Sequence, residues 1–154
     1  MSSIEKLAHE FRAAIEVAIQ ESALSRDIVF QSFPNGCCGD TCDLLAQYFL
    51  EHGIKTKRVL GSLRSKSNFG KQTHAWLQYG NTVIIDITGD QFKDNPTLLH
   101  NSNPVYVGKK KAFHRLFGID DIDTFTGISA LDIGSQRRLT KLYEIIMQFI
   151  DNKE

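Results

Sequence analysis

The sequence predicts a single α+β domain in which helices near both ends of the chain flank a small antiparallel sheet. Apolar residues recur with helical spacing near both ends and again after residue 37, and two β-rich runs meet at a Gly-Asn turn near the middle. No repeat or linker divides the chain. With 154 residues, 42% of them apolar, the chain can build one core of ordinary size. We therefore treat residues 1–154 as one domain.

Two helices are expected in the first third of the chain. Ser2 and Glu5 form a capping box, and the apolar positions that follow repeat every three or four residues to about Glu21. A second helix is expected from about Cys38 to His52, with Gly53 as its stop signal. Its high apolar content predicts that it runs through the core.

The remainder of the chain alternates short apolar runs with polar segments. β-branched and aromatic residues indicate strands, whereas clusters of Asp, Asn, Pro and Gly indicate turns. In chain order we expect a strand at 56–63, a loop at 64–72, a hairpin at 73–88, a short strand at 104–107, a short helix at 110–117, a surface loop at 118–127 and an amphipathic helix from about 135 to 150.

The hairpin formed by THAWLQY and TVIIDIT is the clearest β signal, and its register decides which side chains share a face. A two-residue loop at Gly80-Asn81 would put His74 and Asp86 on opposite faces. A three-residue loop at 79–81 sets His74 directly opposite Asp86 and leaves a continuous apolar face, so we favour it. An aspartate inside the run VIIDI is costly to bury, so a cationic or hydrogen-bonding partner is expected.

Charge and cysteine content argue against several classes of protein. The 18 basic and 18 acidic residues cancel, so no overall field favours nucleic acid or an acidic membrane surface, and we interpret Lys109–Lys111 as a solvated face. We find no signal-peptide pattern and no stretch near the roughly 18 apolar residues of a membrane span. Three cysteines, two of them adjacent, are poorly suited to disulfides. We expect free thiols and a cytoplasmic protein, although one delivered elsewhere by other machinery would have the same composition.

All three cysteines lie in FPNGCCGDTC, residues 33–42, where the second helix is expected to begin. A cysteine in the first helical turn meets unpaired N–H groups and the positive end of the helix dipole, which stabilise a thiolate. The thiolate is the nucleophilic form, and its own backbone N–H can donate to a developing oxyanion. Such a nucleophile needs a base and a residue that orients the base. The hairpin offers His74 and Asp86 for these roles.

The phrases FPNGCCGD, THAWLQY and IIDITGDQF resemble the papain-like and transglutaminase-like superfamily of cysteine hydrolases and acyltransferases, especially its small bacterial papain-fold proteins and toxin-type domains. The resemblance covers about residues 30–107. It implies a helix that carries the nucleophile at its N-terminus and packs against a small antiparallel sheet. It also implies Cys38, the cysteine before Gly-Asp, as nucleophile, His74 as general base and Asp86 as the residue that orients the imidazole.

Four further residues are candidates for contact with the substrate or for an oxyanion hole: Gln31, Gly36, Trp76 and Gln91. Gln31 lies upstream of the nucleophile, as the oxyanion glutamine of papain-like peptidases does, and glycines around the cysteines would let a substrate carbonyl approach the backbone. Gln91 and its neighbour Asp90 follow the Asp86 strand closely enough to line a pocket. The chain departs from papain-like peptidases because Gly39, not Trp, follows the nucleophile and no second lobe is evident.

The resemblance implies acyl transfer from a protein or peptide amide. With water as acceptor the protein would be an amidase, a peptidase or a protein glutamine deamidase, and with an amine it would be a transglutaminase or acyltransferase. We expect no cofactor and no metal, and neither nucleic acid nor a membrane as partner. The toxin-type resemblance also suggests an inhibitor or immunity protein as a partner.

Three other interpretations remain open at this stage. The cysteines can be core residues, as we expect for Cys37 and Cys42, or they can bind zinc together with His74. The whole domain can be a binding or immunity-type module without catalysis. Asp40 is expected to interact with the helix dipole, and surface positions are expected for the histidines outside the triad: His9, His52, His100 and His114.

Overall fold

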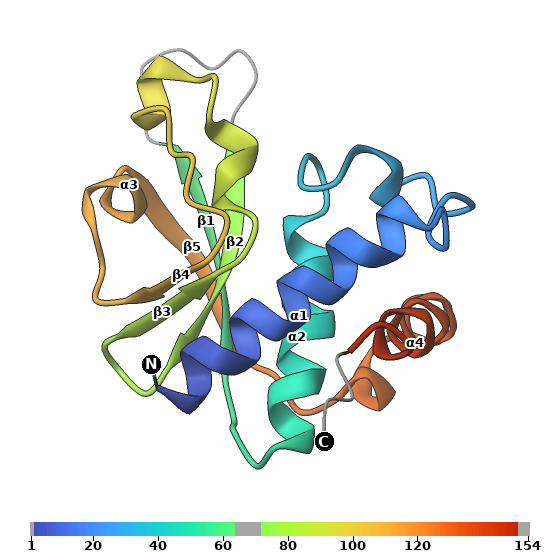
Figure 1. The fold of residues 1–154 in the computed structure, drawn as a ribbon. Coiled ribbons are helices and arrows are strands. Elements are labelled where there is room, and N and C mark those ends of the chain that lie inside the picture. The colour runs from blue at the N-terminus through green and yellow to red at the C-terminus, as the bar shows by residue number, and fades with distance from the viewer. Residues whose placement is uncertain (1, 64–71, 151–154) are drawn as a thin grey trace.

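The computed structural model describes residues 2–63 and 72–150, and it confirms the α+β class (Figure 1). One five-stranded sheet has the order β4-β3-β2-β1-β5 with every neighbouring pair antiparallel. α1 and α2 pack against one face of the sheet, and α4 packs against these two helices. The elements are α1 (Ser3–Gln20), α2 (Cys38–Glu51), β1 (Lys57–Leu63), β2 (Thr73–Tyr79), β3 (Val83–Asp86), β4 (Tyr106–Gly108), α3 (Ala112–Arg115), β5 (Phe117–Thr124) and α4 (Ile133–Met147).

The three long helices begin and end close to the predicted positions. The Ser2 side chain caps α1 by accepting a hydrogen bond of 3.2 Å from the Glu5 N–H. α2 ends one residue earlier than expected. α4 begins at Ile133, ahead of the expected start, because Asp132 caps it by accepting a 3.0 Å hydrogen bond from the Ser135 N–H. Local capping and apolar spacing therefore place these helices.

The sheet is apolar on both faces. The face toward α1 and α2 contributes Ala75, Leu77, Ile85 and Ile87 to the main core, as the predicted apolar face of the hairpin requires. The other face lies under α3 and the segment around residues 92–98. Its buried residues form a second apolar cluster, which Phe117 at the start of β5 joins: Val59, Trp76, Ile84, Phe92, Leu98, Phe113 and Phe117. This second cluster surrounds the part of the hairpin that carries the candidate histidine.

The hairpin register differs from the predicted one. The three-residue loop begins at Gly80, which adopts a φ of +60°, and not at Tyr79, which still pairs within the sheet. The turn centres one position further along the chain than predicted, and Gly80 adopts its positive φ at no steric cost. The register therefore aligns Asp86 with Trp76 instead of His74. Because strand side chains alternate with a period of two, His74 and Asp86 still share a face.

Residues 118–127 are not the surface loop that their polarity suggested. Most of this segment belongs to β5, which pairs antiparallel with β1 and forms one edge of the sheet. All but its first two residues are exposed. Charged side chains are common on edge strands because they discourage pairing with another chain, so the polar composition concealed a strand.

The remaining short elements lie near their predicted positions. β4 overlaps the strand expected at 104–107, and α3 lies inside the helix expected at 110–117. The loop expected at 64–72 falls, apart from Gln72, outside the described residues.

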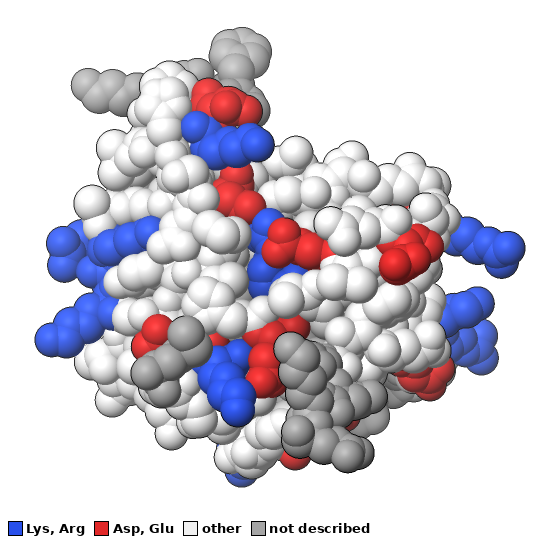
Figure 2. All heavy atoms as spheres, in the orientation of Figure 1, with Lys and Arg blue, Asp and Glu red and all other residues white. Residues whose placement is uncertain are grey.

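Charged side chains of both signs are distributed over the face shown in Figure 2, and neither sign forms a continuous field there. Among the helices of the described segments, none is long and apolar enough to cross a membrane.

Candidate active site

Cys38 is the first residue of α2. Among the described residues no side chain caps this helix, so the first-turn N–H groups that lack an intrahelical partner remain available at the end where Cys38 lies. Gly36 turns the chain into the helix with a φ of +71°, a conformation that favours glycine. The Cys38 side chain is partly buried, and the backbone N–H of Ala75 in β2 contributes to lowering the pKa of its thiol. The nucleophile candidate therefore lies where the N-terminus of α2 meets the sheet.

Arg138 of α4 holds the turn that carries Cys38. Two of its N–H groups donate to the Asp27 carboxylate, at 2.9 Å each, and a third donates to Asp40 at 2.8 Å. Asp27 precedes the turn and Asp40 belongs to the first turn of α2. Asp40 therefore lies at the helix N-terminus, as expected, and it also forms an ion pair with Arg138 that the sequence did not indicate.

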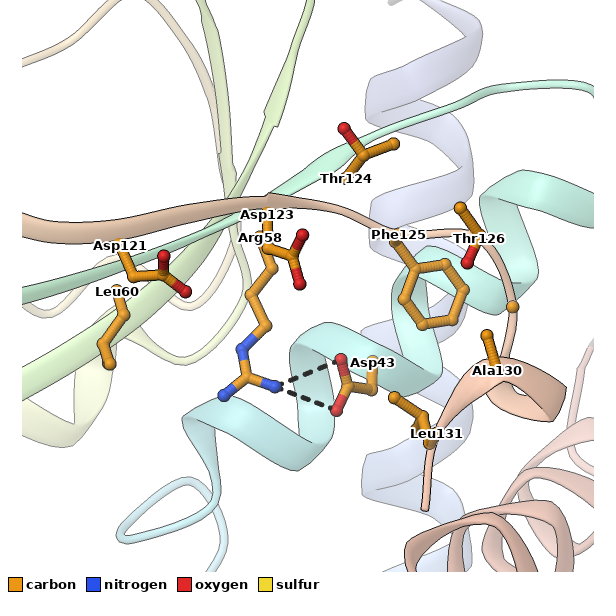
Figure 3. A pocket seen from close by; sticks show the side chains of 11 residues that line it. Asp43, Arg58, Leu60, Asp121, Asp123, Thr124, Phe125, Thr126, Ala130 and Leu131 are labelled. Atoms are coloured by element: carbon orange, nitrogen blue, oxygen red, sulfur yellow. Dashed lines mark hydrogen bonds and ion pairs between the residues drawn. The ribbon is translucent and has the colours of Figure 1, made fainter. Parts of the chain in front are cut away.

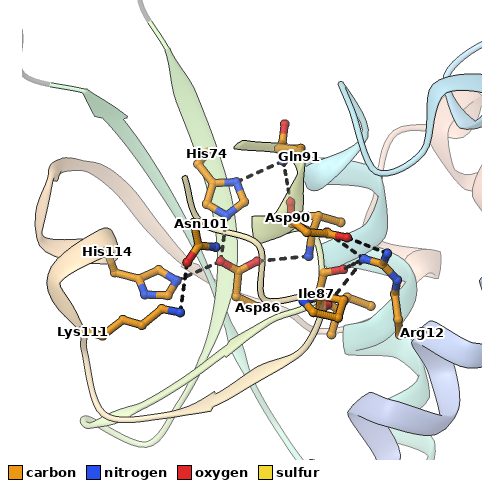
Figure 4. A network of polar contacts seen from close by, with 11 residues as sticks. Arg12, His74, Asp86, Ile87, Asp90, Gln91, Asn101, Lys111 and His114 are labelled. Carbon is orange, nitrogen blue, oxygen red and sulfur yellow. Dashed lines mark hydrogen bonds and ion pairs between the residues drawn. The ribbon is translucent and has the colours of Figure 1, made fainter. Parts of the chain in front are cut away.

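His74 and Asp86 are in direct contact (Figure 4). The Nε2 atom of His74 lies 2.8 Å from Oδ2 of Asp86, and the two side chains are 0% and 2% exposed. The other oxygen, Oδ1, accepts a hydrogen bond of 3.2 Å from the Thr88 N–H. Burial alone would raise the pKa of Asp86, but the charge of His74 and the hydrogen bonds from His114 and His74 outweigh it and hold that pKa well below its usual range. The partner expected for a buried aspartate in VIIDI is therefore present.

The contact with Asp86 decides which nitrogen of His74 carries the hydrogen. An ionised carboxylate only accepts hydrogen bonds, so Nε2 is the donor and Nδ1 is left to interact with the thiol. Gln91 approaches the same nitrogen, with its Nε2 3.4 Å from Nδ1 of His74. The Gln91 amide also donates to the Thr88 carbonyl over 3.0 Å, which fixes its orientation. In the neutral state of His74, both ring nitrogens therefore have a hydrogen-bonding neighbour.

The charges of Cys38 and His74 stabilise one another. Burial alone would raise the pKa of Cys38, but a hydrogen bond with His74, the charge of its imidazolium and the Ala75 N–H bring that pKa below its usual value. Burial alone would lower the pKa of His74, but Asp86 first and Cys38 second raise it to about 9. Both directions favour a thiolate–imidazolium pair, which is the reactive form of a cysteine nucleophile.

A second histidine, expected at the surface from the sequence, contacts the same carboxylate. His114 of α3 is fully buried, and its Nε2 lies 2.8 Å from Oδ2 of Asp86. The surface assignment for His114 is wrong because α3 closes over the second apolar cluster and carries this side chain inward between the rings of Trp76 and Phe113. The one feature of the sequence that could have indicated its burial is the apolar residues around it in KAFHRLF. The three other histidines assigned to the surface are exposed: His9, His52 and His100.

Comparisons of the chain with models of protein families, with curated proteins and with solved structures found no match. The resemblance to papain-like and transglutaminase-like enzymes therefore rests on the residues themselves.

Two of the four accessory candidates lie near the candidate catalytic residues. Gln91 contacts His74, as described above. Gly36 is exposed, and no atom lies within 4 Å of the position that a Cβ would occupy there. Space is therefore available next to the backbone that leads into Cys38.

The other two accessory candidates have different surroundings. Gln31 is exposed, and its side-chain amide donates to the Ser25 carbonyl over 2.8 Å within the preceding loop. Trp76 is only 1% exposed. Its ring lies 5.7 Å from that of His74 and 4.9 Å from that of His114. Trp76 thus packs against both histidines from inside the second apolar cluster, away from any open surface.

Cys37 and Cys42 occupy the main core. Burial raises the pKa of Cys37 to about 12 and that of Cys42 well above its usual value. Both thiols therefore stay protonated and fit the structural role expected of them. Within residues 2–63 and 72–150, no three His, Cys, Asp or Glu side chains are grouped to hold a metal ion, so the zinc interpretation has no ligand set in that part of the chain.

Arg12 of α1 attaches the segment after β3 to the helical layer. Nothing in the sequence pattern indicated this role of Arg12. This buried guanidinium donates to both oxygens of Asp90, at 2.9 and 2.8 Å, and to the Ile87 carbonyl at 2.7 Å. It also lies 4.7 Å from the ring centre of Phe33, in the loop before the nucleophile. Arg12 thus connects the two segments that hold Asp86 and Cys38, and Asp90 is engaged in this ion pair.

A cavity of about 260 Å³ opens beside the first turns of α2 (Figure 3). Arg58 of β1 crosses it and donates to the Asp43 carboxylate at 3.1 and 3.3 Å. Its Nη2 lies 3.4 Å from where a Cβ on Gly39 would stand. The cavity is also lined by residues of β5 and of the segment that follows it, among them Asp121, Asp123 and Phe125. Neither Gly39 nor Cys38 lines this cavity, and Arg58 is the lining residue that approaches the first turn of α2.

Proposed function

We propose that this protein is a cysteine-dependent acyl-transfer enzyme that hydrolyses an amide, as an amidase, a peptidase or a protein glutamine deamidase does. The observation that carries the proposal is the buried His74–Asp86 pair beside a thiol at a helix N-terminus, with the pKa of Cys38 lowered and that of His74 raised. Buried ion pairs contribute little to stability on balance because desolvation opposes them. Strongly perturbed pKa values in such a cluster are typical of catalytic sites.

The reaction follows from the positions of the protons. The thiol proton of Cys38 moves to Nδ1 of His74, and the thiolate attacks the carbonyl carbon of the amide. The N–H groups at the start of α2 donate to the oxyanion, while Asp86 stabilises the imidazolium through Nε2. The imidazolium then gives its proton to the departing amine, which leaves a thioester on Cys38.

The acceptor decides the outcome of the second half-reaction. His74 removes a proton from water, the resulting hydroxide attacks the thioester, and a carboxylic acid and free Cys38 are released. With a primary amine in place of water, the same steps give a new amide. Cys38, His74 and Asp86 serve both outcomes equally, so the test must supply both acceptors.

The test uses an activated ester, because it requires the nucleophile and not a particular substrate. On mixing with p-nitrophenyl acetate, we expect a burst of p-nitrophenolate equal to the enzyme concentration and an acetyl thioester that peptide mapping assigns to Cys38. Cys38→Ala should abolish the burst, while Cys42→Ala, a matched loss of one thiol on the same helix, should retain it. If a primary amine competes with water as acceptor for the thioester, adding the amine should accelerate turnover.

Absence of a burst, or acetylation spread evenly over the three cysteines, would contradict the proposal. Either result would favour a binding or immunity-type module that keeps the domain without catalysis.

A further inference from the structure

We infer that His114 is a positioning residue of the candidate site: it holds the Asp86 carboxylate in the orientation in which Oδ2 accepts a hydrogen bond from His74. This inference rests on the proposed function, because it gives His114 a role in orienting the base that activates Cys38.

The hydrogen bonds of Asp86 are the first reason. His74 and His114 both reach Oδ2 through Nε2 at 2.8 Å, and the Thr88 N–H reaches Oδ1 at 3.2 Å. Without His114, Oδ2 would be held only by His74, the side chain that Asp86 is meant to orient. The hydrogen bond from His114 fixes Oδ2 of Asp86 independently of the His74 imidazole (Figure 4).

The second reason is that His114 donates without bringing a charge. Its Nε2 must carry the hydrogen because it faces a carboxylate, and its buried Nδ1 has no hydrogen-bond partner among the described residues. A proton on Nδ1 would be an unpaired buried donor, close to the charges of Lys111 and of the His74 imidazolium. Burial and these two cations lower the pKa of His114, against the opposing pull of Asp86. A neutral donor leaves the negative charge of Asp86 available to His74.

The third reason is that His114 is itself fixed by packing. Its ring centre lies 4.9 Å from those of Trp76 and Phe113 and 5.6 Å from that of Tyr106. Aromatic neighbours on several sides restrict the imidazole to one orientation. A side chain can position a neighbour only if its own position is determined, and His114 meets this condition.

The experiment measures the rate of iodoacetamide alkylation of Cys38 against pH, mapped by mass spectrometry, in wild type and two variants. His114→Leu fills the space without a donor, and His114→Gln keeps an N–H near the position of Nε2. For His114→Leu we expect the midpoint of the profile to rise by about one pH unit, so that the rate measured at the wild-type midpoint falls about fivefold. For His114→Gln we expect a midpoint close to that of wild type.

A double-mutant cycle tests whether His114 acts through Asp86. In an Asp86→Ala background, His114→Leu should have no further effect on the midpoint. The inference is overturned if His114→Leu lowers the melting temperature but leaves the midpoint unchanged, which is a purely structural role. A lowered midpoint also overturns it, since His114 would then compete with His74 for Asp86.

A measurement on the wild-type protein keeps the inference testable if the variants do not fold. Nitrogen-15 NMR at pH 7 should find His114 neutral with its hydrogen on Nε2, and a charged ring or an Nδ1–H tautomer would overturn the inference. The two proposals fail separately. If Cys38 of wild type reacts like a free thiol and His74→Ala does not change it, the proposed function fails. If Cys38 is activated and only the His114 variants behave as wild type, the positioning role alone fails.

Discussion

Replacing Asp86 with asparagine removes a buried charge and almost no volume, so it isolates what the carboxylate does for His74. The pKa of His74 is about 9 instead of the usual 6.5. At about 1.4 kcal/mol for each pKa unit, this rise corresponds to about 3.5 kcal/mol, which is the net amount by which Asp86 and the Cys38 thiolate outweigh burial in stabilising the imidazolium. In Asp86→Asn, burial still disfavours the charged form of His74, but the negative charge that compensated for burial is gone. The pKa of His74 should therefore fall below 6.5.

The expected result is a loss of thiolate reactivity and a pH-dependent loss of stability. Without the imidazolium, we expect alkylation of Cys38 at pH 7 to slow by about two orders of magnitude, measured with iodoacetamide as a pseudo-first-order rate. Urea unfolding should show a loss of about 3 kcal/mol at pH 6. The loss should be smaller above pH 9, where wild-type His74 has also released its proton.

Asp120→Asn is the matched control, since Asp120 is an exposed carboxylate on β5. It should change the unfolding free energy by no more than about 0.5 kcal/mol and leave the alkylation profile unchanged. If Asp86→Asn kept the wild-type alkylation profile and lost the same stability at pH 6 and pH 9.5, Asp86 would not be charging His74, and the argument would be refuted.

Three further predictions concern the rest of the molecule. Because the pKa of His74 is raised, its contribution to stability is complete below about pH 6.5 and is lost as the pH rises through about 9. The pKa of Asp86 is lowered, so its contribution to stability is present above about pH 4 and declines in acid. Urea titrations at a series of pH values should show both changes in the unfolding free energy, and a free energy independent of pH would contradict them. Arg12→Met should cost about 3–5 kcal/mol in chemical denaturation, because it leaves Asp90 and the Ile87 carbonyl without their buried partner; a loss below 1 kcal/mol would show that Arg12 does not anchor this segment. Cys42 should resist alkylation in the folded protein and react as fast as a free thiol in 8 M urea, and rapid labelling under native conditions would place it outside the core.

The long helices followed from local features of the sequence, whereas the choice of Cys38 as nucleophile followed from the resemblance to cysteine hydrolases and acyltransferases. The Ser2 cap acts on the N–H of a residue three positions away, and the apolar stripes of α1, α2 and α4 repeat within single segments. The position of Cys38 at the start of α2 is a local property of the same kind. The sharing of a face by His74 and Asp86 was also predictable, because any three-residue loop between these strands preserves the alternation of side chains.

What depends on contacts between distant segments was decided only by the tertiary structure. β5 is polar, and its pairing with β1 reveals it as a strand. His114 and Arg12 look like surface residues in the sequence, since a buried polar side chain is recognised only by its partner. Those partners, Asp86 and Asp90, lie 28 and 78 residues away. The sequence by itself therefore determined the helices and the three candidate catalytic residues, and the packing of the second apolar cluster determined how the histidines meet Asp86.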